Sequence, residues 1–153
     1  EKTAKPASKT TELPRAWLKG SFDFSFSGLK TAILHKAQEM NIYPHNNDST
    51  AKSITDLATA FQESVVDILT QKTIEASKVY DAKGIIVGGG VAANRRLREQ
   101  LTEMADHSGI RLFIPPMSLC TDNAAMAAIA EARLEADLTE DLHLDIVPGL
   151  IRP

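Results

Sequence analysis

The sequence predicts an α/β architecture in which helices pack against a sheet. Short apolar runs at Ile85–Val87 and Ile110–Ile114 have the length of buried strands. Around them, apolar residues recur at helical spacing, which is typical of helices that bury one side. The chain has 153 residues, of which 43% are hydrophobic, so it can bury the core of an ordinary single domain.

Composition narrows the classes of protein to which the chain can belong. The formal net charge is −3 with acidic and basic residues interspersed, so no broad basic surface holds nucleic acid by itself. A single cysteine excludes an internal disulfide, and no apolar run approaches membrane-spanning length. We therefore expect a soluble, cytoplasmic protein whose contact with any RNA needs other surfaces as well.

The first residues differ in composition from the rest of the chain. Residues 1–20 are predicted to form a polar, partly flexible N-terminal segment, and residues 21–153 to form the folded lobe. The sequence begins without an initiator methionine and without the layout of a signal peptide. We expect it to be a fragment of a larger protein.

The first predicted strand is Phe22–Phe26, where aromatic and polar residues alternate with the period of a half-buried strand. Ser27 is then expected to cap a helix that ends before Pro44. That helix carries its apolar residues on one side, at Leu29, Ile33, Ala37 and Met40. The segment His45–Thr50 is predicted to be a polar loop.

The longest helix is predicted from about Ser53 to Tyr80. Asp67, Gln71 and Glu75 are expected on the side opposite its apolar residues, which are Ile54, Leu57, Phe61, Val65, Ile68 and Leu69. The strand Ile85–Val87 and the glycines come next in the chain.

Another helix is predicted after the glycines, with Leu97, Leu101, Met104 and Ala105 on its buried side. Gly109 is expected to end it, with His107 near its negative end. The last helix is predicted from Thr121 or Asp122 to about Ala136, and its many alanines would let it pack closely on a neighbour. The tail 137–153 has no clean period and is expected to be mostly loop.

The glycines Gly88, Gly89 and Gly90 are the first candidate for a ligand site. Glycines between a strand and a helix let a ligand approach the backbone closely, and the helix N-terminus favours an anion such as a nucleotide phosphate. A tight turn that uses glycine only for its geometry is the equal alternative. The dinucleotide fingerprint fails because Pro115-Pro116 stands where an acidic residue should follow the next strand, and no P-loop Lys-Ser or Lys-Thr follows the glycines.

A second candidate is the loop that carries Asp122 to the start of the last predicted helix. In one interpretation Asp122 or Thr121 is an N-cap and Asn123 is merely a first-turn residue. In the other, Asp122 binds a metal near the glycine loop, with further ligands from outside this chain because one carboxylate is not enough. Both interpretations stay open.

Other polar residues give weaker signals. The four histidines show no i, i+4 pairing of the zinc-protease kind, and each is expected on the surface or at a helix end. Cys120 is expected to be a small buried residue in preference to a nucleophile. Arg95, Arg96 and Arg98 could contact phosphate, but a solvated helix face with Arg95 paired to Glu99 is the favoured interpretation.

Three blocks in order, Phe22–Thr31, Gly88–Arg98 and Cys120–Met126, resemble the tRNA threonylcarbamoyladenosine transferase family, also called O-sialoglycoprotein endopeptidase or glycoprotease. The likeness runs from about Leu13 to the C-terminus. It implies the C-terminal ribonuclease-H-like lobe of an actin, sugar-kinase and Hsp70-type (ASKHA) fold, in which two lobes clasp a nucleotide.

The resemblance also implies roles for particular residues. Asn94 would bind the nucleotide-derived substrate, and Gly88, Gly89 and Gly90 would line its adenosine or phosphate side. Asp122 would be a ligand of one divalent metal ion, iron in preference to zinc, completed by a His-x-x-x-His pair of the N-terminal lobe. Ser27, Gly28 and Lys30 also match the family pattern, and a turn that shapes the cleft is enough to explain them. Gly88 is a small departure from the pattern, because many relatives have another small residue at this position.

The reaction implied by the resemblance is transfer of a threonylcarbamoyl group from threonylcarbamoyl-AMP to the exocyclic amine of the adenosine next to the anticodon, in tRNAs reading codons that begin with A. Partner proteins of the same pathway and the other lobe would share the contact with tRNA. The fragment alone is expected to be inactive and to be capable of self-association. The alternatives are an ATP-binding lobe of an actin-like or sugar-kinase-like ATPase or phosphotransferase, a metalloprotease, and a non-catalytic interaction module.

Overall fold

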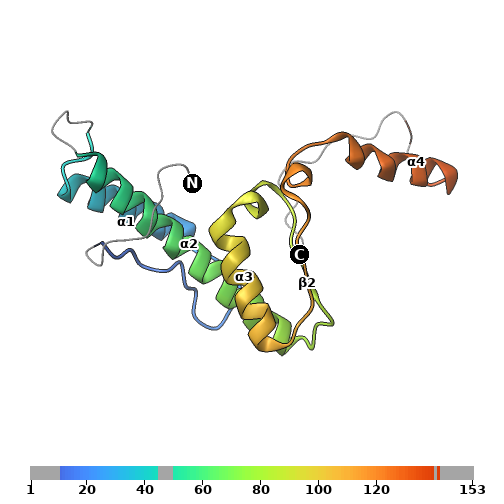
Figure 1. Ribbon diagram of the computed structural model, residues 1–153, viewed down its shortest axis with the longest axis horizontal. Helices are drawn as coiled ribbons and strands as arrows, with labels where there is room; N and C mark the ends of the chain where they lie inside the picture. The colour runs from blue at the N-terminus through green and yellow to red at the C-terminus, as the bar shows by residue number, and fades with distance from the viewer. Residues whose placement is uncertain (1–10, 45–49, 140, 142–153) are drawn as a thin grey trace.

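A computed structural model describes residues 11–44, 50–139 and 141 of the chain. Two short strands pair in parallel, with Ile85 opposite Leu112 and Ile86 opposite Phe113. The helices are α1 (Phe26–Glu39), α2 (Ala51–Val79), α3 (Arg95–Ser108) and α4 (Ala128–Glu135); the strands are β1 (Ile85–Ile86) and β2 (Leu112–Phe113); and the 3₁₀ turns are η1 (Gly90–Ala93), η2 (Met117–Leu119) and η3 (Ala124–Ala127) (Figure 1). Helices and a parallel sheet confirm the predicted α/β class.

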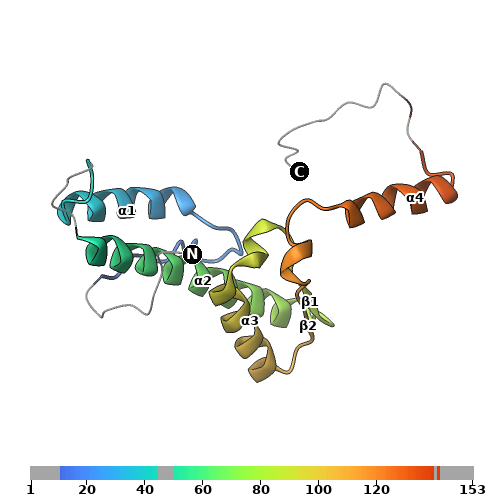
Figure 2. The ribbon, with the colours of Figure 1, turned by 45° about the horizontal axis from the view of Figure 1, so that its top comes forward.

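The long helix α2 organises the molecule, because the other core elements pack along it (Figure 2). Around its first half, Leu57 and Ala60 form one apolar cluster with Leu29 of α1 and with Leu13. Near its end, Ile74 forms a second cluster with Ile85 of β1 and Ala105 of α3. Each cluster removes apolar surface from water, which is the main driving force for assembling these elements.

Three predicted helices are confirmed. Helix α1 ends before Pro44, and its Leu29, Ile33, Ala37 and Met40 share one cluster. Helix α2 begins two residues earlier than predicted, at Ala51, where the Thr50 side chain accepts a hydrogen bond from the backbone N–H of Ser53. Helix α3 ends at Gly109, whose φ of 66° is the left-handed conformation that glycine adopts at helix ends.

The predicted strand Phe22–Phe26 is wrong. Only Phe24 makes a β-bridge, with Trp17, and α1 already begins at Phe26. The alternating aromatic rings contact different neighbours, since Phe22 lies against Tyr80 and Phe24 stacks on Phe26. Ser25, not Ser27, occupies the N-cap position of α1, and no side chain completes that cap.

The buried lysine Lys72 of α2 explains the extended course of this segment. Its ammonium donates to the carbonyl oxygens of Leu18, at 3.4 Å, and Ser21, at 2.9 Å, and also to that of Asp23. It lies 5.6 Å from the ring centroid of Trp17 and 5.3 Å from that of Phe24. The side chain is a cationic anchor for the segment, which therefore follows α2 instead of joining a sheet.

The polar side predicted for α2 is also wrong at Asp67. This carboxylate is half-buried between the N-terminal segment and α3. Leu13 and Ala16, which precede the predicted lobe, are both 5% exposed. Since Arg15 lies between them and binds Asp67, the side of α2 expected to face water packs against residues 13–16.

The last helix begins later than predicted. Asn123, and neither Thr121 nor Asp122, is an N-cap, and it caps the 3₁₀ turn η3: its side chain accepts a hydrogen bond from the backbone N–H of Ala125 at 3.0 Å. This turn precedes α4, which begins at Ala128. The N-cap position of α4 itself is Ala127, which makes no side-chain cap. No residue of α4 is buried, so the close packing expected of its alanines is not found within the described residues.

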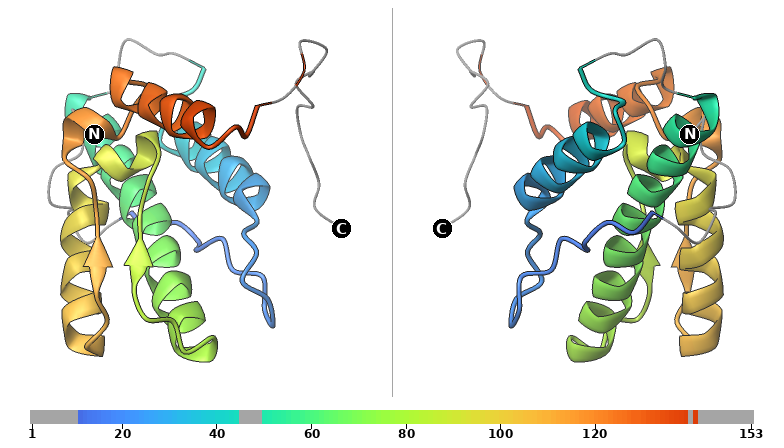
Figure 3. Two further views of the ribbon diagram at one scale, coloured as in Figure 1. Left: turned by 90° about the vertical axis from the view of Figure 1, so that its right-hand side faces the viewer. Right: turned by 90° about the vertical axis from the view of Figure 1, so that its left-hand side faces the viewer.

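Among the described residues, the sheet is covered on one face only, by α2 and α3, as the two opposite views of Figure 3 show. On the other face, Ile86 is 85% exposed and its register partner Phe113 is 58% exposed. No helix among the described residues is long and apolar enough to cross a membrane. Apart from residues 137–139 and 141, which lie in no regular element, the predicted loop 137–153 falls outside the described residues, as does 45–49 of the loop predicted at 45–50.

Candidate functional site

The two candidate loops leave the sheet at the same edge. Beyond the strands, the backbone N–H of Val87 donates to the carbonyl of Phe113 at 2.9 Å, which keeps the chains side by side to the start of the glycines. Because β1 and β2 are parallel, the glycine loop after β1 and the loop after β2 both lie at their carboxyl ends. Ligands of open α/β sheets bind outside this edge.

The glycine loop is open on its outer side. Gly89 has φ of 88°, a conformation that favours glycine, whereas no such backbone requirement holds for Gly88 or Gly90. A Cβ built on any of the three glycines meets no heavy atom within 4 Å. The neighbouring parts of this chain therefore explain a glycine at only one of the three positions.

Asn94 joins the loop to α3 and α2. Its Oδ1 accepts a hydrogen bond from the backbone N–H of Leu97 at 3.0 Å, which caps α3, and its Nδ2 donates to Oε1 of Gln62 at 3.1 Å. The 3₁₀ turn η1 separates the glycines from the cap, so the helix does not begin directly after them as the sequence suggested. The positive end of α3 still points toward the glycine loop.

An apolar hollow of about 510 Å³ lies beside Asn94. Its walls come from α1, α2, the turn η1 and the start of α3, and they include Ile33, Phe61, Val65, Leu69, Val91 and Leu97. Gln62, the amide partner of Asn94, is at its rim. An apolar space with a few amide groups at the edge is the usual form of a small-molecule site.

Arg98 connects the two loops. Its Nε donates to the carbonyl of Ala92 in η1 at 2.6 Å, and its Nη2 donates to the carbonyl of Pro115 at 2.5 Å. The same Nη2 lies 3.0 Å from Sγ of Cys120, a free thiol that is 2% exposed. Cys120 is thus buried as expected.

The arginine run is not the solvated face expected from the sequence. Arg95 is exposed, but Arg96 forms a two-fold hydrogen bond to Glu63, with Nε–Oε1 at 2.8 Å and Nη2–Oε2 at 3.0 Å. The hydrogen bond to Glu63 raises the pKa of Arg96, and the charges of Glu63, Glu99 and Asp67 add to the effect against burial, which lowers it. Arg96 therefore binds α3 to α2, whereas Arg98 forms hydrogen bonds to the two loops.

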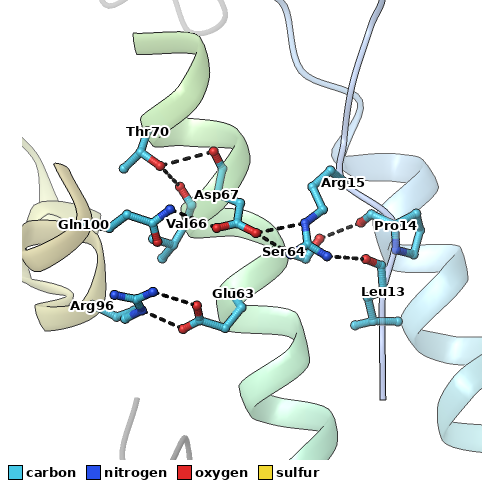
Figure 4. Close-up of polar contacts among 10 residues, drawn as sticks. All are labelled: Leu13, Pro14, Arg15, Glu63, Ser64, Val66, Asp67, Thr70, Arg96 and Gln100. Atoms are coloured by element: carbon cyan, nitrogen blue, oxygen red, sulfur yellow. Dashed lines mark hydrogen bonds and ion pairs between the residues drawn. The ribbon is translucent and has the colours of Figure 1, made fainter. Parts of the chain in front are cut away.

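Asp67 forms the polar centre between three segments (Figure 4). It accepts hydrogen bonds from Gln100 of α3, at 2.9 Å, and from Arg15 of the N-terminal segment. Burial raises the pKa of the Asp67 carboxyl, but the hydrogen bonds from Gln100 and Arg15 and the charges of Arg15 and Arg96 outweigh it and hold this pKa below 3.8. This centre fixes α3 relative to α2, and with it the cap of α3 at Asn94.

Asp122 is exposed and follows Cys120 by two residues. Its carboxylate has no hydrogen bond or ion pair within the described ranges. The described residues hold no group of three His, Cys, Asp or Glu side chains placed for a metal ion. The exposed carboxylate can serve as one ligand residue of a metal, and the described residues do not complete such a site.

Sequence reasoning missed the residues that support the site. Gln62, Glu63 and Asp67 contact α3 from positions about thirty residues earlier, and no local pattern indicates such contacts. The cap at Asn94 did have a signal, because asparagine directly before a helical run is a preferred N-cap. Arg98 had none, since its acceptors are backbone carbonyls and a thiol.

Comparison with known proteins shows the family of the chain. The family model TsaD, described as tRNA N6-adenosine threonylcarbamoyltransferase, matches residues 1–129, which include the glycine loop and Asp122. The chain belongs to this family. The resemblance drawn from the three sequence blocks is therefore confirmed.

Similar proteins carry the same name. One from Shouchella clausii (strain KSM-K16) is 44% identical over 155 residues, covering 98% of this chain and 44% of the relative. One from Bacillus subtilis (strain 168) is 48% identical over 134 residues, covering 85% of this chain and 37% of the relative. The chain spans about two-fifths of the length of these threonylcarbamoyltransferases.

Proposed function

We propose that this chain supplies one side of a cleft that binds threonylcarbamoyl-AMP, in an enzyme that transfers the threonylcarbamoyl group to the exocyclic amine of the adenosine next to the anticodon. The substrates are tRNAs reading codons that begin with A. The observation that carries the proposal is the glycine loop, whose three glycines face open space at the carboxyl edge of the sheet. Family membership supports the same reaction.

The chain would be the C-terminal ribonuclease-H-like lobe of an actin, sugar-kinase and Hsp70-type fold. In the part of the chain that the structure describes, the sheet has two strands and one bare face, which is consistent with a lobe that is completed by other parts of a longer protein. The predicted division of the chain at residues 20 and 21 belongs to the same proposal, with residues 13–16 of the first segment packed against α2 of the lobe. The isolated lobe would not catalyse transfer, because the other side of the cleft is needed to enclose the substrates.

The glycine loop and Asn94 would hold the adenylate. Gly88, Gly89 and Gly90 leave room for the phosphate near the positive end of α3, where an anion is favoured. The apolar hollow next to Asn94 has space for the adenosine part, and the amides of Asn94 and Gln62 stand at its rim to recognise polar groups. Because the phosphate and the adenosine part of the adenylate are both held, the acyl carbonyl is oriented toward the incoming amine.

In the transfer itself, the exocyclic nitrogen of the tRNA adenosine forms a bond to the carbamoyl carbon. The bond from that carbon to the phosphate oxygen breaks, AMP leaves, and the nitrogen loses a proton. A divalent metal ion, iron in preference to zinc, supplies orientation and polarisation of the donor when bound. Asp122 would give it one oxygen ligand, and its other ligands would come from outside this chain.

The partners follow from the same proposal. The net charge of −3 leaves this chain without a dominant basic surface, so tRNA would be held jointly with the other lobe and with further proteins of the modification pathway, in the cytoplasm. The bare apolar side chains of the sheet and α4, among them Ile86 and Ile129, would also let the isolated chain associate with itself.

Asn94 provides the test, because its structural and ligand roles can be separated. Asn94→Asp keeps a good N-cap for α3 but loses the hydrogen bond that Nδ2 donates to Gln62, so the free energy of unfolding should fall by no more than about 1.5 kcal/mol. The added negative charge should weaken the binding of threonylcarbamoyl-AMP or AMP to the full-length protein by about tenfold or more, equal to about 1.4 kcal/mol. Isothermal titration calorimetry measures the affinity.

Thr50→Ala is the matched control, since it removes the cap of α2. It should cost about 1 kcal/mol of stability and leave the adenylate affinity unchanged. Adenylate binding by Asn94→Asp that equals that of the unchanged protein would refute the proposal. Binding of ATP with phosphoryl transfer and without any threonylcarbamoyl transfer would favour a phosphotransferase lobe instead.

A further inference from the structure

Arg98 is hydrogen-bonded to both loops of the candidate site. Its guanidinium reaches from the first turn of α3 to Ala92 in one loop and to Pro115 and Cys120 in the other. The three donor–acceptor distances are 2.6, 2.5 and 3.0 Å. A charged donor makes shorter and stronger hydrogen bonds to such acceptors than a neutral donor does.

The chemistry of the guanidinium suits this bridging position. It is planar, stays charged and presents five N–H donors in fixed directions, whereas a lysine ammonium presents three donors from a single atom. Its Nε and Nη2 point to acceptors in separate loops. Within the described ranges, no carboxylate forms an ion pair with Arg98, so backbone carbonyls and a thiol are its partners.

Both loops carry a residue of the proposed site. Ala92, whose carbonyl Arg98 binds, follows Gly90 by two residues and precedes Asn94 by two. Cys120 precedes Asp122 by two residues. A displacement of either loop would therefore move the adenylate-binding residues relative to the carboxylate.

We propose that Arg98 is a positioning residue that holds the glycine loop and the Asp122 loop in register. This inference rests on the proposed function, because it assigns the adenylate to the first loop and a metal ligand to the second. Arg98 does not touch the substrate in this scheme. It sets the distance between Asn94 and Asp122, so that both act on one bound adenylate.

The test compares substitutions in the full-length protein, below the melting temperature of each variant. Arg98→Met removes the donors but keeps most of the side-chain volume, and Arg98→Lys keeps the charge without the planar fork. Both should weaken adenylate binding, the former by about tenfold, and both should lower the content of bound metal. Arg96→Met is the matched control, since it breaks a bond between α2 and α3 and leaves both loops untouched.

Cys120 reports on the second loop independently of substrate and metal. Its thiol is 2% exposed and lies against Arg98, so loss of the guanidinium should speed its reaction with a thiol reagent by about tenfold, measured on the Cys120 peptide by mass spectrometry. Arg96→Met should leave this rate unchanged. For Arg98→Ala, added methylguanidinium should occupy the vacated space and restore both the slow rate and the adenylate affinity.

The outcomes separate this inference from the function on which it rests. If the unchanged protein binds no adenylate, the proposed function fails and the inference with it. If it binds adenylate, and the Arg98 variants lose melting temperature while they keep affinity, metal content and the slow Cys120 reaction, Arg98 is only structural. Arg98 is also only structural if methylguanidinium restores neither the slow Cys120 reaction nor the adenylate affinity of Arg98→Ala. An Arg98→Lys variant with the adenylate affinity and metal content of the unchanged protein would lead to the same conclusion.

Discussion

Asp67 holds three segments together, and replacing it by asparagine tests how much this polar centre stabilises the fold. The Asp67 side chain is 19% exposed and receives hydrogen bonds from Arg15 Nε, Arg15 Nη2 and Gln100 Nε2. An asparagine side chain would keep the shape of the carboxylate but lose the charge, and its amide nitrogen would face one of the two donor groups. The substitution therefore removes the charge and one of the two acceptor oxygens, and leaves the donors in place.

The expected loss follows from these contacts. A hydrogen bond to a charged group contributes about 1.5–3 kcal/mol, and three such bonds reach Asp67. The Arg15 side chain is 35% exposed, so water replaces part of what it loses. We therefore expect Asp67→Asn to lower the free energy of unfolding by about 2–3 kcal/mol in total.

Equilibrium unfolding of the chain in urea at neutral pH measures this loss. With a slope of about 1–3 kcal/mol per molar urea, the midpoint should fall by about 1 M. Glu63→Gln is the matched control, one turn earlier on α2, and its more exposed pair with Arg96 should cost less than about 1 kcal/mol. A midpoint for Asp67→Asn equal to that of Glu63→Gln would refute the reasoning.

The pH dependence of the free energy of unfolding is a second test of the role of Asp67. Because folding holds the pKa of Asp67 below 3.8, the charged form is the one that folding stabilises. Its contribution is present above about pH 3.8 and is lost as the pH falls through the folded-state pKa. The difference between the unchanged chain and Asp67→Asn should be constant near neutral pH and should shrink below pH 3.8. A difference that does not change with pH would mean that the charge is not its source.

Two further substitutions test local features of the fold. Gly109→Ala places a Cβ at φ of 66° and should cost about 1 kcal/mol by thermal denaturation, although nothing lies within 4 Å of that Cβ; no change would mean that α3 does not need its left-handed end. Lys72→Met leaves the carbonyls of Leu18, Ser21 and Asp23 without their donor, and limited proteolysis should then cut the 17–24 segment faster. An unchanged cleavage rate would show that Lys72 does not hold this segment.

The elements that sequence reasoning predicted well are those that depend on near neighbours. Helix α1 and helix α3 follow from apolar residues at helical spacing, and the end of α3 follows from Gly109. The incorrect strand at Phe22–Phe26 depended on a partner, and alternation alone does not supply one. The cap at Asn123 was assigned to the wrong residue because Thr121, Asp122 and Asn123 are all acceptable caps, and only the backbone course selects among them.

The site divides in the same way. The glycines, Asn94 and Asp122 stand out in the sequence as motif residues, and their assigned roles stay predictions. The side chains that hold them in place could not be found, because Arg98 reaches Pro115 across 17 residues and Gln62 reaches Asn94 across 32. These contacts depend on the parallel order of β1 and β2 and on the crossing of α2 and α3, which are known only once the chain is folded.

The glycine loop was open to two interpretations, a tight turn or a ligand site, and its geometry favours the second. A turn needs glycine where φ is positive, which is the case at Gly89 alone. At Gly88 and Gly90 the backbone accepts other residues and a Cβ would meet nothing within 4 Å, so neither strain nor crowding within the described chain requires glycine there. A glycine in such a position costs backbone entropy on folding and returns no contact. We propose that close approach of a ligand to the backbone is the missing reason, so Gly90→Ala should weaken adenylate binding without lowering stability.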